Sequence, residues 1–140
     1  MHPFRAAVEA RDIDAAISLL ADDVLFRSPV VFKPYRGRGS VAPLLIAVSR
    51  VFEGFRYVRE LGAPGTSDHA LLFEARVGDR ELQGCDFLHT NAAGLIDELM
   101  VIVRPLTAAL ALAEAMQREL GSSTGEVART PDQRAARSPR

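Results

Sequence analysis

Asp86 stands inside LQGCDFLHT (residues 82–90), a stretch that a surface strand would not resemble. A surface strand alternates polar and apolar side chains, whereas Asp86 has Cys85, Phe87 and Leu88 as neighbours. An aspartate in such a strand is neutral, is paired, or faces a cavity that holds a ligand. Desolvation in an apolar cavity raises the pKa of a carboxyl, which could then donate to a ligand carbonyl, accept from a hydroxyl or act as a base. Asp86 is therefore the candidate catalytic residue. The alternative is an aspartate paired with an arginine or with backbone amides, which only braces the cavity.

The remaining reactive side chains form no second cluster. Cys85 and His89 share a strand face, but four residues of strand separate them by about 13 Å, too far for one metal ion. The other histidines, His2 and His69, complete no ligand set with them, and we expect no metal and no cofactor. Tyr35 and Tyr57 are candidates to bring hydroxyl groups to a cavity.

Composition limits the class of protein. The chain has 140 residues, enough for one domain, with 48% hydrophobic and 25% charged residues and a net charge of −1. The absence of a basic block interleaved with aromatics argues against nucleic acid as a partner. No apolar run in the sequence approaches the length of a membrane span, so we expect no membrane partner. The N-terminus carries early charges, so we do not expect it to be a signal peptide, and the single cysteine suits a reducing compartment. We therefore expect a cytoplasmic protein.

The elements that must position Asp86 follow from hydrophobic periodicity. Helical spacing predicts two short N-terminal helices, the second capped by Asp12, and a third helix over 41–52 capped by Ser40. Ala21–Asp23 is expected to stop the second helix. Two short extended segments, 24–28 and 30–39, then lead to the third helix. The period then changes to two, which predicts four long antiparallel strands over 55–61, 69–77, 81–90 and 95–104. A last helix is predicted over 106–120. This order is that of an α+β domain covering 1–120, with 121–140 expected to be a disordered tail because it offers almost no apolar surface to bury.

Three stretches carry a family resemblance. EARDIDAAISLLADDVLFRSPV, then YRGRGSVAPLL, then GCDFLHTNAAGLIDELMVIVRP, resemble in order and spacing the nuclear-transport-factor-2-like superfamily, and more closely its small bacterial SnoaL-like proteins. The similarity covers Phe4 to Pro105. It implies a conical fold, in which a curved antiparallel β-sheet wraps around N-terminal helices and leaves a deep pocket, here with a C-terminal helix added. Members include isomerases, epoxide hydrolases, cyclases, dehydratases and non-catalytic binding modules, so the fold does not fix a reaction.

The resemblance also implies roles for individual positions. It puts Asp86 where ketosteroid isomerases hold a protonated aspartate against the enolate oxygen. Ser28 stands at the position of their base, and Phe4 at the position of a catalytic tyrosine. An epoxide hydrolase would need an aspartate near Val101, in a segment that reads LMVIV. The established chemistries of the family are therefore incomplete in this sequence.

Strand parity extends the predicted pocket. If Asp86 faces the pocket, its parity partners Gly84, Leu88 and Thr90 face the same side, and Leu99, Val101 and Val103 should line it from the last strand. Met100 and Ile102 then point outward, which predicts a second layer on the sheet, either a partner subunit or the C-terminal helix. The predicted lining of the pocket consists of Phe4, Phe26, Ser28, Tyr35, Tyr57, Asp86, Leu88, Leu99, Val101 and Val103.

Two functional hypotheses follow. The leading one is a homodimer whose mainly apolar pocket binds an unidentified small apolar molecule, with cofactor-free acid–base catalysis on a carbonyl compound as its enzymatic form. The rival is a non-catalytic dimerisation or protein-interaction module whose cone is filled by its own side chains. An open apolar cavity favours the first hypothesis. A cone filled by Phe4, Phe26 and Phe87 favours the second.

Overall fold

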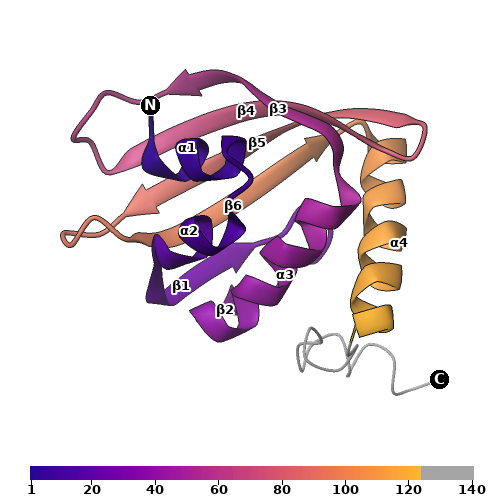
Figure 1. The fold of residues 1–140 in the computed structure, drawn as a ribbon, viewed down its shortest axis with the longest axis horizontal. Helices are drawn as coiled ribbons and strands as arrows, with labels where there is room; N and C mark the ends of the chain where they lie inside the picture. The colour runs from indigo at the N-terminus through magenta and orange to yellow at the C-terminus, as the bar shows by residue number, and fades with distance from the viewer. Residues whose placement is uncertain (124–140) are drawn as a thin grey trace.

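The computed structural model describes residues 1–123 (Figure 1). Three helices and two strands come first, then four long strands and a final helix. Their bounds are α1 (Pro3–Glu9), α2 (Ile13–Ser18), β1 (Leu20–Arg27), β2 (Tyr35–Arg36), α3 (Arg38–Val51), β3 (Glu53–Leu61), β4 (Asp68–Val77), β5 (Arg80–Thr90), β6 (Ile96–Arg104) and α4 (Leu106–Ser123). The predicted α+β fold with a C-terminal helix is confirmed.

The six strands form one open sheet in the order β2-β1-β6-β5-β4-β3. The β3 to β6 meander is antiparallel as predicted, but β1 pairs with β6 in parallel, so the sheet as a whole is mixed. A parallel pair needs a long crossover connection, and the elements from β2 to β5 supply it. Helices α1, α2 and α3 lie on one side of the curved sheet, and α4 stands beside α3 (Figure 1).

Two local predictions need correction. Helix α3 begins at Arg38 and its N-cap is Gly37, with φ of 90°, so Ser40 lies inside the first turn and does not cap it. Glycine adopts this left-handed backbone at little cost, and the helix can start three residues early. Ala21, Asp22 and Asp23, predicted to stop a helix, belong instead to β1. The capping role of Asp12 is confirmed, since its Oδ1 accepts from the amide of Ala15 at 3.0 Å.

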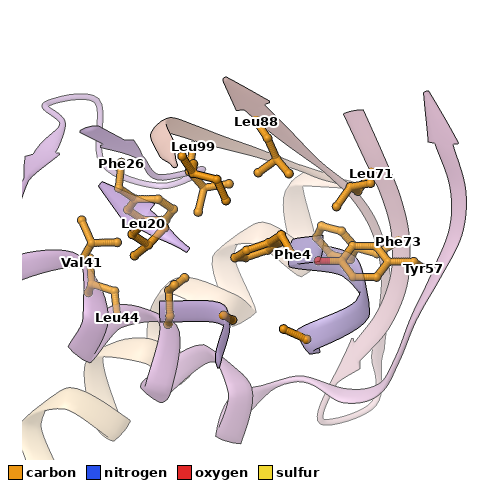
Figure 2. Close-up of a cluster of buried hydrophobic side chains, with 14 of the residues drawn as sticks. Phe4, Leu20, Phe26, Val41, Leu44, Tyr57, Leu71, Phe73, Leu88 and Leu99 are labelled. Carbon is orange, nitrogen blue, oxygen red and sulfur yellow. The ribbon is translucent and has the colours of Figure 1, made fainter. Parts of the chain in front are cut away.

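The core lies between the helices and the sheet. Leu71, Leu88 and Leu99 reach it from the sheet, and Leu44 reaches it from α3 (Figure 2). Phe4 of α1 lies in the middle of this cluster, close to Phe73 and Tyr57. Burial of these side chains fixes the position of α1 against the sheet and with it one wall of the site described below.

Helix α4 continues to Ser123, beyond the predicted end of the domain at residue 120. The predicted disordered tail, 121–140, lies outside the described residues from 124 onward. The division into 1–120 and 121–140 therefore stays a prediction. In the described part of the chain, no helix is both long and apolar enough to cross a membrane.

Candidate functional site

A cavity of about 800 Å³ opens between the sheet, the N-terminal helices and α4. Its volume falls within the range of sites that bind small organic molecules. Most of its wall is apolar, with Phe4 and Val8 from α1, Leu44 and Val48 from α3, and Met116 and Leu120 from α4. Phe4 and Phe26 contribute to the wall without filling the cavity, and Phe87 lies on the opposite face of the sheet.

Asp86 and Tyr57 form a hydrogen-bonded pair in this wall. The hydroxyl of Tyr57 donates to Oδ2 of Asp86 at 2.7 Å. The sheet register brings them together, because Tyr57 is opposite Phe73 on β4 and Asp86 is opposite Leu71. Phe73 and Leu71 are two residues apart and share a face, so all four side chains point to the same side of the sheet.

Burial dominates the electrostatics of the pair. Asp86 and Tyr57 are 8% and 7% exposed, respectively. Desolvation raises the pKa of Asp86 to about 7, against the opposing effect of the hydrogen bond from Tyr57. Burial, and then the charge of Asp86, raise the pKa of Tyr57, which therefore stays a neutral donor. Within residues 1–123 Tyr57 is the hydrogen-bond partner of Asp86, so the alternative of pairing with an arginine or with backbone amides does not describe this carboxyl.

An aromatic cluster holds Tyr57 in place. Its ring meets the Phe55 ring edge-on, with centroids 4.9 Å apart, and meets Phe73 at 6.3 Å in the same orientation. Arg5 of α1 places its guanidinium carbon 5.9 Å from the centroid of the Tyr57 ring. The position of the phenol, and so the direction of its hydroxyl, is defined by these neighbours.

The predicted lining residues divide into two groups. Leu88 is packed in the core, 2% exposed, and does not line the cavity. Val103 lies at a shallow hollow that Arg27, Phe32 and Ile102 also line. Parity names the face of a strand but not how far along that face a cavity extends, which is why these two positions were wrongly placed. The structure brings the other predicted lining residues together around the cavity: Phe4, Phe26, Ser28, Tyr35, Tyr57, Asp86, Leu99 and Val101.

Ser28 is engaged by the chain itself. Its Oγ accepts from the amides of Val30 and Val31, each at 3.0 Å, and so closes the turn that follows β1. A serine in this role is not a base. Tyr35 is buried with its ring 6.1 Å from that of Phe26, and it forms part of the apolar wall.

Within residues 1–123, no three histidine, cysteine, aspartate or glutamate side chains come together as a metal site. His89 binds Asp97 at 2.6 Å, and Cys85 is partly buried beside Asp86 in the sequence but on the other face. The expectation of no metal and no cofactor stays a prediction.

Sequence reasoning missed two features of the site. It did not pair Tyr57 with Asp86, although the alternation in FRYVREL was a signal for the face that Tyr57 occupies. It also offered the C-terminal helix as a cover for the outer sheet face, whereas α4 packs against α3 and lines the cavity. Ile102 on that outer face is left half-exposed.

Comparison with solved structures decides the family. A steroid delta-isomerase from Pseudomonas aeruginosa is 40% identical over 84% of this chain and 85% of that chain, with a TM-score of 0.79. The chain is a SnoaL-like member of the nuclear-transport-factor-2-like superfamily. A conserved bacterial protein with a cystatin-like fold from Silicibacter pomeroyi DSS-3 is 35% identical to this SnoaL-like chain. The match covers 88% of this chain and 89% of the Silicibacter chain, with a TM-score of 0.81.

A more distant structure shares the fold alone. An NTF2-like protein from Cytophaga hutchinsonii ATCC 33406 matches the SnoaL-like chain at 18% identity and a TM-score of 0.55, over 74% of this chain and 85% of that one. No family profile and no curated protein sequence matches the chain.

Proposed function

We propose that this SnoaL-like protein binds a small, mainly apolar carbonyl compound, with the carbonyl oxygen at the Tyr57–Asp86 pair. Asp86 then carries cofactor-free acid–base chemistry of the isomerase, cyclase or dehydratase type. One observation carries the proposal: a buried carboxyl with a near-neutral pKa lines an apolar cavity of about 800 Å³. The 40% identical protein described as a steroid delta-isomerase supports the same reaction class.

The pair can serve both halves of a proton transfer. Tyr57 occupies Oδ2 of Asp86, which leaves the second carboxyl oxygen for a ligand. A protonated Asp86 donates a hydrogen bond to the carbonyl oxygen of a bound ligand. An ionised Asp86 takes the proton from the carbon next to the carbonyl and returns the same proton at the far end of the double bond, so the isomerisation is balanced by this one carboxyl. A pKa of about 7 keeps both forms populated near neutral pH, where general acid–base catalysis is most effective.

Two other carboxylates line the cavity, but each already interacts with another group of the protein. Glu9 forms an ion pair with Arg5 at 3.0 Å, and Asp12 caps α2. With Ser28 closing a turn and Phe4 lacking a hydroxyl, Asp86 is the group to which we assign the chemistry.

The test uses apolar ketones as probes. A panel of bicyclic to tetracyclic β,γ-unsaturated ketones is offered to the protein, with binding followed by ligand-observed NMR and conjugation of the double bond followed by ultraviolet absorbance. Asp86→Asn should reduce turnover by about 10²–10⁴-fold, the usual size of a general acid–base contribution. Asp22→Asn, on an exposed aspartate of β1, is the matched control and should leave it unchanged. A folded wild-type protein that binds none of these ketones would contradict the proposal.

A second candidate function is a homodimerisation or protein-interaction module, favoured by the outer face of the sheet. Phe87 lies opposite Met100 and Cys85 lies opposite Ile102, so these four side chains form one patch on β5 and β6. Phe87 and Ile102 are 39% and 52% exposed, so the patch presents apolar surface that a second copy of the chain would cover. A homodimer through this patch is compatible with ligand binding, because the cavity lies on the other side of the sheet.

Sedimentation analysis separates these outcomes. Ile102→Glu should convert a dimer into a monomer. Leu110→Glu, at an exposed apolar position of α4, should not. A wild-type protein that sediments as a monomer at all concentrations would exclude the homodimer. The cytoplasmic location belongs to the same proposal, and its support is the single cysteine, which offers no intramolecular disulfide.

A further inference from the structure

Arg5 contacts the Tyr57–Asp86 pair from outside the cavity. Its guanidinium carbon lies over the Tyr57 ring, 5.9 Å from the centroid. Arg5 is not among the residues that line the cavity, although its neighbour Phe4 is. Any influence of Arg5 on the carboxyl of Asp86 therefore passes through the Tyr57 ring or through the field of its charge.

Two carboxylates hold the guanidinium in this place. Nε of Arg5 donates to Oε2 of Glu9 at 3.0 Å, and one of its terminal nitrogens donates to Oε1 of Glu60 at 3.4 Å. Oε2 of Glu60 accepts from the backbone amide of His2 at 2.9 Å, so Glu60 is itself fixed. The planar guanidinium can reach two carboxylates and still lie against a ring, which the single ammonium group of a lysine cannot reproduce.

We propose that Arg5 is a positioning residue of the Tyr57–Asp86 pair. Its guanidinium, clamped by Glu9 and Glu60, lies on the Tyr57 ring, keeps the hydroxyl directed at Asp86 and stabilises negative charge on the pair. A cation over an aromatic face is attracted to it, which restrains the ring. The inference rests on the proposed function, because it treats this pair as the reacting group.

The charges around the pair set the direction of the effect. Arg5 and Glu9 face it from α1. Glu60 lies on β3 beside Arg5, next to His2 and His69, whose rings are 4.8 Å apart. Cys85, the neighbour of Asp86 on β5, points to the other face. Arg5 lowers the pKa of Tyr57 while Glu9 raises it, both less strongly than burial does.

Removal of Arg5 leaves Glu9 and Glu60 without their common cation. Glu9 then disfavours negative charge at Tyr57 without the opposing effect of Arg5, and the restraint on the Tyr57 ring is lost as well. A ring that is less well held weakens the hydrogen bond that stabilises the ionised form of Asp86. The substitution Arg5→Met should raise the pKa of Asp86 by about 0.5–1 unit, the size expected for a charge acting across a partly screened protein interior.

The experiment measures the pKa of Asp86 by carbon-detected NMR of its carboxyl group in each variant. Arg50→Met is the matched control, because it also removes one arginine from an ion pair, with Glu119 at 3.3 Å, but on the α3–α4 contact. We expect a shift of less than about 0.2 unit in the control, where only long-range screened charge is lost. Arg5→Lys should fall between wild type and Arg5→Met, since it keeps the charge and loses the two-carboxylate geometry.

The outcomes keep the two proposals apart. Equal pKa values of Asp86 in Arg5→Met and Arg50→Met would overturn the role of Arg5, whatever the wild-type value is. A wild-type pKa near that of a free aspartate would instead contradict the proposed function. If Arg5→Met fails to fold, Arg5→Gln keeps a donor for the glutamates, removes the cation and should give the same upward shift. The chemical shift of the Tyr57 ring carbon that bears the hydroxyl provides a second readout of whether the phenol has moved.

Discussion

Gly84 of β5 lies directly against the ring of Phe73 on the neighbouring strand. A methyl group at position 84 would overlap Cζ of Phe73 and come within 2.7 Å of its Cε1. Glycine is thus required here by the space that the ring takes, and the same ring packs against Phe55 and Tyr57. The direction of the Tyr57 hydroxyl depends indirectly on a missing side chain two residues before Asp86.

We expect Gly84→Ala to lower the free energy of unfolding by about 1–3 kcal/mol, the usual cost of overpacking a core. Gly39→Ala is the matched control, because nothing lies within 4 Å of the added carbon. Gly39 is in helix α3, where alanine should stabilise by about 0.5–1 kcal/mol. Urea denaturation measures both. Equal stability of the two variants would mean that Phe73 is free to move away.

Tyr57→Phe should raise the pKa of Asp86 above its wild-type value. The hydroxyl of Tyr57 stabilises the ionised carboxylate. Phenylalanine removes this donor and keeps the ring packed among its aromatic neighbours. NMR titration of the Asp86 carboxyl measures the change. Tyr35→Phe serves as the control, because Tyr35 lies on β2 and the hydrogen bond to the Asp86 carboxyl comes from Tyr57. A pKa that stays the same or falls in Tyr57→Phe would show that the hydroxyl does not donate to the carboxylate.

Asp86 should make the folded protein less stable as the pH rises. Its pKa is about 7 in the folded state and about 4 in an unfolded chain. Between those values the folded state binds the additional proton, so stability falls with increasing pH across this window and levels off above it. Asp86→Asn removes the titrating group. The gain in unfolding free energy of Asp86→Asn over wild type should therefore grow by a few kcal/mol, in order of magnitude, from pH 4 to pH 8. A pH-independent difference in chemical denaturation would contradict the raised pKa.

Met116→Trp should reduce the size of the largest ligand that the cavity can bind. Met116 lines the cavity from the half-buried part of α4, so an indole there takes up ligand space at a modest cost to folding. Leu110→Trp, at an exposed position of the same helix, is the control and should leave ligand size selection unchanged. Binding of a homologous series of ketones of increasing size gives the measurement. An unchanged size limit in Met116→Trp would mean that α4 moves aside when ligand enters.

Much of the fold could be predicted from local pattern. The period of two in residues 81–90 is enough to place Asp86 on one face of the strand and Cys85 and Phe87 on the other, because side chains alternate whatever the partner strand is. The capping of α2 by Asp12 was equally accessible, since it depends on the four consecutive residues from Asp12 to Ala15. Both are decided within a few residues of chain.

The missing parts depend on contacts between distant segments. The Tyr57–Asp86 pair needs the register of β3 on β4, which shifts between Tyr57 and Arg59 and cannot be read from alternation alone. The place of α4 depends on which apolar surface it covers, and α3 and the outer sheet face were both available to it. Gly37 set the start of α3 through its backbone angle, where the sequence pattern favoured Ser40.

The alternation of β5 has a consequence for how this protein tolerates change. Asp86 faces the cavity, while its neighbours Cys85 and Phe87 belong to the exposed apolar patch. One strand therefore contributes side chains to both the cavity wall and the outer patch. A point substitution on either side can leave the other intact. The loss of a single residue from the turn before β5 would slip the strand by one position and exchange the two faces. The acid would then lie on the outer patch and an apolar side chain in the cavity, and both proposed functions would be lost in one step.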